Sequence, residues 1–334
     1  MNSRAIPLFP ASGWRLYSVE EFALIGAAPK GYLAHGDPDR ADCTGYIAKK
    51  GRLAEGGMRE CVTEEIISKI GSLLPIRMAK SRLVRLPVGK GKPPDVRFLS
   101  RNFIRRGEEE LIHGIEIVGQ YFGAKKDEVE TAFNLRDKRS ERTFYTVSNM
   151  VEVLKWFCRT DSELVEIASG FAKMLAFDAL VGAPDRHALN WGVVASIAEP
   201  LRERRFAPIF DTARGLFREH TDEKLTAIVG EGRQEEYVRN YAERSRPVFG
   251  MSAEAEPGPK CNHFDLIEAA IGDFPELLGT VIVRFINHVP IGAIEHMVRK
   301  RFRGVISPLR IAFVTDLLRY RYGRLKVLAT GSKL

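Results

Sequence analysis

The clearest helical pattern in the chain covers residues 160–181, where apolar side chains recur around much of the helix circumference. Thr160 followed three residues later by Glu163 is typical of a capping box, which predicts the start of the helix. Gly182 and Pro184 predict its end. We therefore expect a buried, rigid helix that delivers the chain directly into the polar loop that follows.

Short segments rich in apolar residues predict strands in the first third of the chain. The predicted strands lie at residues 44–50, 81–86 and 96–104. An amphipathic helix is predicted at residues 59–70, with its glutamates away from the apolar side. Residues 1–43 are rich in Gly, Pro and turn formers, so we interpret them as an N-terminal arm with one short helix at residues 18–25.

Helical patterns dominate after Gly107. The other predicted helices lie at residues 109–121, 126–133, 147–157, 263–271, 275–287 and 291–301, and a last one has Ser307 as its N-cap. Residues 212–260 are predicted to contain a long irregular portion, either a lid beside a site or a surface connection. The prediction is an α+β, bilobal fold with a small β-rich lobe at residues 1–107 and a larger, mainly helical lobe at residues 108–334.

Three polar residues surround a predicted hairpin in the second half of the chain. Strands at residues 191–194 and 206–210, with a turn centred near residues 200–201, place Asn190 beside Asp211 at the open end. An amide oxygen and a carboxylate are ligands that magnesium prefers. Asp185 precedes them in the loop and can lie outside the metal shell. A carboxylate beside a metal site is the arrangement that phosphoryl transfer uses to accept a hydroxyl proton.

Each of these three residues has another interpretation when taken alone, because Asp and Asn are common in turns and caps. The same holds for the lysines that end the strand at residues 44–50 and the glutamates of the following helix. A strand lysine and a helix glutamate hold phosphates in kinase-type sites, yet both types of side chain can equally face solvent. It is the combination around one hairpin that favours a catalytic site.

Composition and charge narrow the classes of function. The chain has 334 residues, 45% hydrophobic and 28% charged, which is typical of a globular protein of one large domain or two lobes. A net charge of +8 favours anionic partners such as nucleotides, phosphorylated substrates or RNA, although the basic residues are dispersed. The four cysteines form no C-x-x-C pair, and Cys261 with His263 does not make a zinc motif. No G-x-S-x-G elbow supports a hydrolase.

The sequence begins without the pattern of a signal peptide, and it has no run of about eighteen apolar residues. Together with the sparse cysteines, this favours a reducing compartment. We expect a cytoplasmic protein with no membrane insertion.

The segment D-R-H-A-L-N followed by F-D-T-A-R-G resembles the catalytic and metal-binding segments of HipA-like kinases, a bacterial branch of the protein-kinase-like superfamily. The Asp-x-His order is also similar to phosphoinositide kinases. The resemblance extends more faintly over roughly residues 30–320, through T-G-Y-I-A-K-K, T-E-E-I-I-S-K-I-G, S-R-L-V-R-L and L-S-R-N-F-I. It implies a protein-kinase-like fold with ATP and Mg²⁺ as cofactors.

The resemblance also implies a role for individual residues. Asp185 is the catalytic base, and Asn190 and Asp211 are the magnesium ligands. Lys49 binds phosphate, with Lys50 as the alternative because the strand register is open, and Glu64 is its helix partner. The backbone that meets adenine belongs to Leu99, Ser100, Arg101 and Asn102. Arg186 and His187 are expected to brace the loop or pair with nearby acids.

Two departures from kinase patterns limit the resemblance. D-T-A-R-G stands where ordinary kinases have D-F-G, so their conformational switch is in doubt, and no glycine fingerprint assigns the phosphate loop. The implied acceptor is a Ser or Thr of a protein, with an RNA- or tRNA-associated target and an antitoxin-type partner as further implications. The alternatives are a phosphoinositide or small-molecule kinase, and a catalytically silent nucleotide- or RNA-binding protein on the same fold.

Overall fold

The structure of the protein, a computed structural model, describes residues 1–10, 12–22, 30–38, 40, 43–51, 57–87, 95–123, 145–251 and 261–331. The helix predicted at residues 126–133 and the end of the one predicted at residues 18–25 lie outside these ranges. The part that is described of the latter forms α1 (Val19–Phe22), and a 3₁₀ turn, η1 (Ser3–Ala5), lies near the N-terminus.

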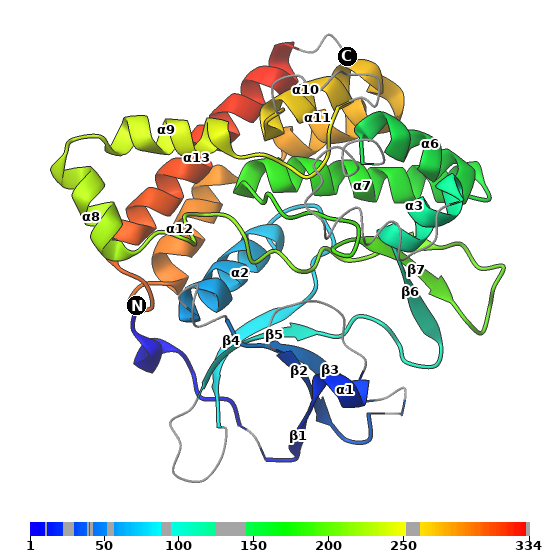
Figure 1. Ribbon diagram of the computed structural model, residues 1–334, viewed down its shortest axis with the longest axis horizontal. Coiled ribbons are helices and arrows are strands. Elements are labelled where there is room, and N and C mark those ends of the chain that lie inside the picture. The colour runs from blue at the N-terminus through cyan, green and yellow to red at the C-terminus, as the bar shows by residue number, and fades with distance from the viewer. Residues whose placement is uncertain are drawn as a thin grey trace.

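A five-stranded antiparallel sheet forms the N-terminal part of the protein (Figure 1). Its order is β1 (Trp14–Tyr17), β2 (Lys30–His35), β3 (Thr44–Lys49), β5 (Asp95–Arg101) and β4 (Ser81–Leu86). The three predicted strands are confirmed. The interpretation of residues 1–43 as an arm was wrong, because this region supplies β1 and β2. The strand β2 escaped prediction because four consecutive residues, Gly31 to Ala34, are buried, so its sequence lacks the alternation of apolar and polar residues that marks a half-exposed strand.

The helix α2 (Met58–Gly71) packs against β4 and β5 and lies between the sheet and the helical part of the protein (Figure 1). Its apolar residues belong to the main core, which also contains the interior of the C-terminal helices. Glu60, Glu64 and Glu65 are buried as well, with 8%, 2% and 1% of their surface exposed. The solvent-facing interpretation of these glutamates was wrong, because α2 is covered on more than its apolar side.

A second sheet, in the order β6 (Glu109–His113), β7 (Gly192–Ser196) and β8 (Arg205–Phe206), begins the helical part. The helix predicted from residue 109 was wrong in its first five residues, which pair with β7 instead, and α3 covers Gly114–Phe122. The five-stranded sheet ends at Arg101, before the lobe boundary at residue 107, which stays a prediction.

The hairpin of β7 and β8 exists, but its register differs from the predicted one. Val193 lies opposite Phe206, so the pairing is shifted by two residues and does not place residue 190 opposite residue 211. The second strand is also shorter than predicted. After Phe206 the chain leaves β7, and Ile209 forms an isolated bridge with Met78 instead.

Most of the predicted helices are confirmed. They are α6 (Val147–Phe157), α7 (Asp161–Val181), α10 (His263–Asp273), the π-helical segment Pro275–Gly279 continued by α11 (Thr280–Asn287), α12 (Ile291–Arg301) and α13 (Pro308–Gly331). The irregular portion predicted at residues 212–260 was partly wrong, because it contains α8 (Asp222–Gly230) and α9 (Gln234–Arg244). Only Val238 and Ala242 are buried in α9, which explains its weak apolar pattern.

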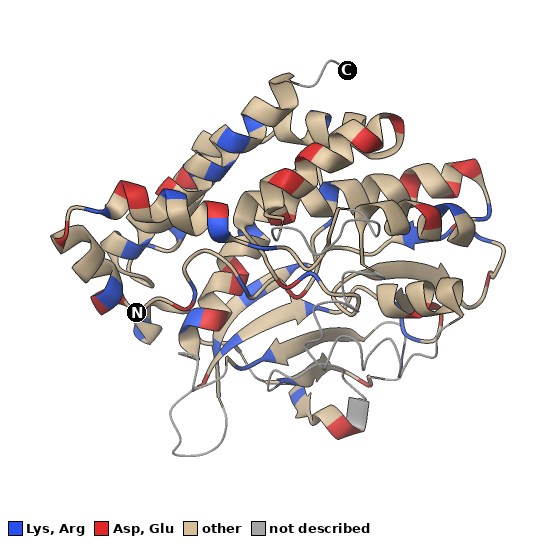
Figure 2. Ribbon diagram, turned by 45° about the horizontal axis from the view of Figure 1, so that its top comes forward, with Lys and Arg blue, Asp and Glu red and all other residues tan. Residues whose placement is uncertain are grey.

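The helix α7 begins at the predicted N-cap Thr160, but the reciprocal half of the predicted capping box is absent, because the Glu163 carboxylate accepts from the Arg159 N–H and from Arg204. Thr160 accepts a hydrogen bond from the Glu163 N–H at 3.1 Å, and Gly182 ends the helix in the left-handed region at φ 69°. Lys and Arg residues are spread over the sheet and the helices (Figure 2). In the described residues, no single helix has the length and apolar composition to cross a membrane. Two consecutive helical segments, Pro275–Asn287 and Ile291–Arg301, reach this length and composition when taken together, but they are bent by 60° relative to each other.

Replacing Phe171 tests how strongly α7 depends on its buried face. Phe171 has no exposed surface and packs edge-on against Trp191 and Phe249. We expect Phe171→Ala to lower the free energy of unfolding by about 3–5 kcal/mol in urea titrations followed by circular dichroism. Val165→Ala, on the exposed face of the same helix, is the control, with an expected change within about 0.5 kcal/mol. Equal losses in the two variants would contradict this assignment of the core.

Candidate active site

A cavity of about 470 Å³ lies between the five-stranded sheet and the loops that follow α7 and β8. Seven of the nine predicted site residues line it: Lys49, Ser100, Arg101, Asn102, Asp185, Asn190 and Asp211. The other two lie outside the lining. Glu64 is buried behind Lys49, and Leu99 belongs to a small core on the sheet with Phe9 and Tyr46. The structure thus brings residues that are up to 162 positions apart in the chain to one hollow.

Lys49 lies at the end of β3 and bridges the two sides of the cavity. Its Nζ is 2.6 Å from Glu64 Oε1 on α2 and 3.0 Å from Asp211 Oδ1. Lys50 points elsewhere and pairs with Asp95 at 2.8 Å, because consecutive residues of an extended chain face opposite ways. Of the two lysines that the sequence left open, the structure therefore places Lys49 with Glu64 and Asp211.

Burial and ion pairing set the charges of this cluster. Burial opposes the charged form of Lys49, but Asp211 and Glu64 outweigh it and keep the pKa of Lys49 above its usual value. Burial likewise opposes ionisation of Asp211, yet Lys49 lowers the pKa of Asp211 to about 2. For Glu64, burial prevails over the attraction of Lys49 and raises the pKa to about 7. Near neutral pH, Lys49 and Asp211 are charged and Glu64 is close to its titration point.

The loop after α7 carries Asp185 with its side chain 38% exposed, and this carboxylate pairs with Arg214 Nε at 3.1 Å. The Asn190 side-chain amide donates to the backbone oxygen of Asp185 at 2.7 Å. Because only the NH₂ end of an amide can donate to a carbonyl, this contact fixes the orientation of Asn190. Its side-chain oxygen is then left to accept or to ligate.

Arg186 connects this loop to α7 through hydrogen bonds of its guanidinium. Its guanidinium donates two hydrogen bonds to Asp178 of α7, each 2.8 Å long. Its remaining nitrogen donates to the backbone oxygens of Asn190 and Phe210, at 2.9 and 2.8 Å. Asp178 and Arg186 are each 3% exposed, so one buried bidentate pair joins a rigid helix, the loop of Asp185 and the residue before Asp211.

His187 stabilises the same loop as a neutral imidazole. Burial lowers its pKa, and its Nδ1 accepts from the Leu189 N–H at 3.3 Å. The remaining ring proton therefore belongs to Nε2 in the neutral form. The expectation that Arg186 and His187 brace the loop or pair with nearby acids agrees with these contacts.

The segment after Phe210 has an unusual backbone. Asp211 has φ 53°, in the left-handed region that non-glycine residues seldom adopt. Asp is among the residue types that tolerate this region best. Backbone strain of this kind is concentrated at functional sites, because the surrounding structure must hold the residue in place. Here Asp211 is kept in place by the ion pair of its side chain with Lys49 and by the hydrogen bond from Arg186 to the backbone oxygen of Phe210.

Comparison with known proteins agrees with this geometry. The protein-family model described as HipA-like C-terminal domain matches residues 22–272, which is more than half of the chain. The protein belongs to the HipA-like family. Its resemblance to the HipA-like family and the α+β, bilobal, kinase-like fold predicted from the sequence are thereby confirmed, and membership of this family supports a kinase of the HipA type.

Two solved structures are similar to this HipA-like chain. The proinflammatory kinase CtkA of Helicobacter pylori has a TM-score of 0.70 at 15% identity, covering 98% of this chain and all of that one. HipA of Shewanella oneidensis, in a complex with HipB and operator DNA, has a TM-score of 0.44 at 12% identity, covering 97% of this chain and 73% of that one. At these identities the likeness concerns the fold alone. No curated protein matches the sequence.

A HipA-like kinase uses ATP and a divalent metal, and the donor set here fits magnesium. Asp211 supplies an ionised carboxylate at the cavity, and Asn190 supplies an oxygen whose orientation is fixed by its own amide hydrogen bond. Among the described residues, no group of three or more His, Cys, Asp and Glu forms a metal cage. Magnesium suits such a sparse site, because it is usually held by one or two carboxylates together with substrate phosphates.

Some residues of the HipA-like site were missed by the sequence analysis. Asp178 carries a detectable signal, because it is one acid in the most apolar stretch of α7. Lys30 and Arg214 also line the cavity. Lys30 was overlooked with its strand, and its register partner is Lys49 itself. No pattern in the sequence marks Arg214, since its pairing with Asp185 depends on tertiary contact.

Removing the acid under Arg186 tests the bracing of the loop. Asp178→Asn leaves a buried guanidinium without its counter-charge, so we expect the free energy of unfolding to fall by about 3–5 kcal/mol. Glu152→Gln is the matched control, because its pair with Lys155 is exposed and should contribute less than about 1 kcal/mol. Denaturant titrations measure both. A loss in Asp178→Asn no larger than in the control would exclude a supporting role for the pair.

The raised pKa of Glu64 predicts a pH-dependent stability. Because folded Glu64 binds its proton more tightly than unfolded Glu64, its contribution is full below pH 4.5 and is lost as pH rises through about 7. Glu64→Gln removes this dependence. Relative to wild type, we expect the variant to gain on the order of 2 kcal/mol between pH 5 and pH 8 in magnesium-free urea titrations. Glu268→Gln, at an exposed position of α10, should show a flat difference over the same range.

Proposed function

We propose that this HipA-like protein transfers the γ-phosphate of ATP to the hydroxyl of a serine or threonine in a protein. The observation that carries the proposal is the convergence of Lys49, Asp185, Asn190 and Asp211 on one cavity of about 470 Å³. Phosphoryl transfer depends almost entirely on positioning and charge neutralisation, and these four residue types supply both.

The base of the nucleotide would lie against apolar side chains of the cavity. Ile47, Ile104 and Leu111 belong to its lining, and Phe103 packs beside Phe210 with ring centroids 5.6 Å apart. The predicted adenine-binding backbone at residues 99–102 leads directly into Phe103 and Ile104. The side-chain amide of Asn102 already accepts the Ile104 N–H at 3.2 Å, which fixes the turn there.

The phosphates would contact the charged residues of the cavity, first of all Lys49. Glu64 and Asp211 hold the Lys49 ammonium in one position, so it needs little reorganisation to contact phosphate oxygens. Lys30 is the register neighbour of Lys49 and faces the same cavity, which makes it a second candidate for phosphate binding. Magnesium held by Asn190 and Asp211 would neutralise phosphate charge when it is bound.

The transfer itself would use Asp185 as the proton acceptor. The hydroxyl oxygen of the acceptor forms a bond to the γ-phosphorus while the bond from that phosphorus to the β–γ bridging oxygen breaks. The hydroxyl proton moves to a carboxylate oxygen of Asp185, and ADP leaves with the bridging oxygen. Because Arg214 pairs with Asp185 at 3.1 Å, its guanidinium must shift or share the carboxylate as the acceptor arrives.

Other acceptors and partners stay predictions. A phosphoinositide or small-molecule acceptor, an RNA- or tRNA-associated target and a silent nucleotide- or RNA-binding role were all compatible with the sequence, and a transfer assay separates them. The HipA structure of Shewanella oneidensis contains HipB and operator DNA. An antitoxin-type partner for the present chain is a separate prediction from phosphotransfer.

Substitution of the site residues tests the proposal. We expect Asp185→Asn and Asp211→Asn to lower transfer of labelled γ-phosphate into lysate proteins by about 10²–10⁴-fold, because the proton acceptor or a metal ligand is lost. Lys49→Ala should also lose transfer and bind ATP more weakly in calorimetry. Lys50→Ala is its matched control and should retain activity within about twofold, since Lys50 lies outside the lining of the cavity and pairs with Asp95, whose side chain is 28% exposed. Full transfer by Asp185→Asn would refute the assignment of the base.

A further inference from the structure

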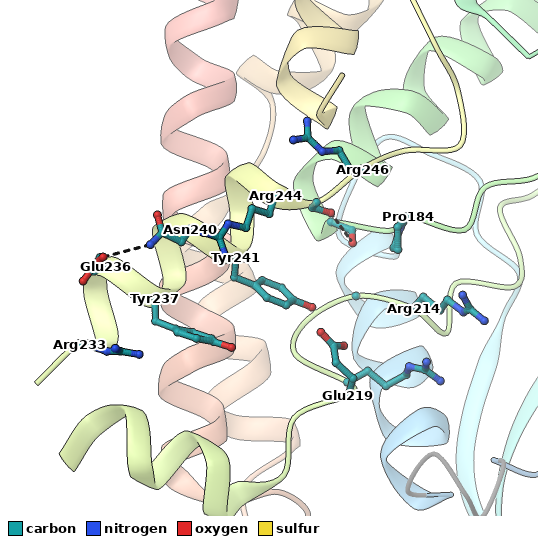
Figure 3. Close-up of a pocket in the computed structure, with 14 residues that line it drawn as sticks. Pro184, Arg214, Glu219, Arg233, Glu236, Tyr237, Asn240, Tyr241, Arg244 and Arg246 are labelled. Carbon is teal, nitrogen blue, oxygen red and sulfur yellow. Dashed lines mark hydrogen bonds between the residues drawn. The ribbon is translucent and has the colours of Figure 1, made fainter. Parts of the chain in front are cut away.

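A second hollow, of about 680 Å³, opens beside the catalytic loop (Figure 3). It lies between the end of α7, α9 and residues 214–219, and we call it the arginine groove. Arg214 lines both this groove and the ATP cavity, and Pro184 at its edge directly precedes Asp185. The groove therefore ends next to the proposed proton acceptor in the chain and shares Arg214 with the first cavity.

Arginines are the commonest charged residues in the lining of the arginine groove. Its lining contains the five arginines Arg214, Arg218, Arg233, Arg244 and Arg246 against the two acids Glu219 and Glu236. The labelled arginines among them lie on different sides of the hollow in Figure 3. The Glu219 side chain is 52% exposed, with its carboxylate 3.4 Å from His220 Nδ1. Three of the five arginines pair with acids: Arg214 with Asp185, Arg218 with Glu60 and Arg233 with Glu231. Arg244 and Arg246, at the end of α9 and just after it, are exposed to solvent.

The wall of the groove is rigid. Phe217 packs against Tyr241 and Tyr237, with ring centroids 4.1 and 6.5 Å apart, and Tyr237 is hydrogen-bonded to His220 at 2.7 Å. The backbone of residues 215–217 has positive φ throughout, and a Cβ on Gly215 would lie 3.0 Å from the Val181 oxygen. The backbone after Arg214 is thus packed closely on the end of α7.

We propose that the arginine groove binds an acidic segment of the protein acceptor and so places its serine or threonine at Asp185. This inference rests on the proposed function, because the acceptor hydroxyl must reach that carboxylate. Arg214 links recognition to chemistry: an acidic side chain of the acceptor competes for its guanidinium, which frees Asp185 to take the hydroxyl proton. The acceptor is thus recognised by carboxylates or phosphates next to its phosphorylation site.

The contents of the groove favour an acidic protein segment over RNA. Single-stranded RNA is commonly held by aromatic faces on which its bases stack. Here Tyr237 and Tyr241 each pack against Phe217 within the protein. In addition, the two glutamates of the lining would repel a continuous run of phosphates, whereas a folded or extended peptide can place its acids beside the arginines alone.

The first test measures binding without ATP. The probes are fluorescein-labelled heptapeptides in which one serine is flanked on each side by three glutamates, three glutamines or three lysines. Fluorescence anisotropy should show the glutamate peptide binding at least about tenfold more tightly than the glutamine peptide, and no binding of the lysine peptide. Arg244→Glu combined with Arg246→Glu should weaken the glutamate peptide by about tenfold.

Charge reversal elsewhere on the same helix is the control. Arg239 is exposed on α9 and lies outside the lining of the groove, so Arg239→Glu should change binding by less than about twofold. Equal effects of Arg239→Glu and the double variant would mean diffuse attraction to a basic protein and would overturn the proposal. An RNA competitor gives a second way to overturn the proposal. If an equimolar uridine decanucleotide displaced the glutamate peptide and also bound the double variant more weakly, the groove would be an RNA site.

Phosphotransfer kinetics separate failure of this inference from failure of the proposed kinase activity. With the glutamate peptide as acceptor, the double variant should raise KM by about tenfold and leave kcat unchanged, since it loses binding but not chemistry. Transfer to the glutamine peptide at an equal kcat/KM would overturn the groove while leaving the kinase activity intact. Selective peptide binding without ATP turnover would sustain the groove and refute the kinase activity.

Discussion

The buried pair of Asp178 and Arg186 is the contact on which the rest of the site depends. A bidentate ion pair with both partners 3% exposed is costly to desolvate, and it is stable only if every donor is satisfied. Each of the three nitrogens of Arg186 has a partner, because Nε and Nη2 bind Asp178 and Nη1 donates to the backbone of residues 190 and 210. The same requirement that makes the pair tolerable in the core therefore sets the relative positions of the proposed proton acceptor and both proposed metal ligands.

The charged cluster of Lys49, Glu64 and Asp211 suits the binding of a metal cation together with an anionic nucleotide. Lys49 lies between Glu64 and Asp211, so this cluster carries more acid than base when all three are ionised. Burial relieves the excess by raising the pKa of Glu64 to about 7. A bound divalent cation would relieve it in a second way, and Lys49 and Lys30, which line the same cavity, would then be able to contact phosphates. The balance of charge depends on ligands that arrive as a pair.

Local patterns in the sequence predict the parts of this structure that local physics decides. The capping of α7 by Thr160, its end at Gly182 and the strand Ser81–Leu86 follow from spacing and turn chemistry. The strand β2 was missed because its central residues are buried on both faces, so no alternation is visible. The segment Glu109–His113 was assigned to a helix because its pairing with β7, eighty residues later, leaves no local trace.

The candidate site likewise contains residues that local patterns predict and residues whose positions depend on tertiary contacts. Asp185, Asn190 and Asp211 were found from residue type and spacing, and all three line the cavity although the predicted hairpin register was shifted by two residues. That tolerance arises because the chain leaves the ladder after Phe206, so loops rather than strand pairing place Asp211. The choice between Lys49 and Lys50, the burial of Glu64 and the pairing of Arg214 with Asp185 are tertiary properties, and one sequence does not encode them in a readable pattern.

The bridge between Met78 and Ile209 has a mechanical consequence. The Ile209 N–H donates to the Arg77 oxygen at 2.8 Å, and the Ala79 N–H donates to the Ile209 oxygen at 3.1 Å. Residues 77–79 join α2 to the sheet, and Ile209 lies two residues before Asp211. These two bonds tie the segment between α2 and the sheet directly to the segment that leads to Asp211. A displacement of residues 77–79 would therefore be transmitted to Asp211 through the backbone, whereas Lys49, on a different strand, is tied to Asp211 by its side chain alone.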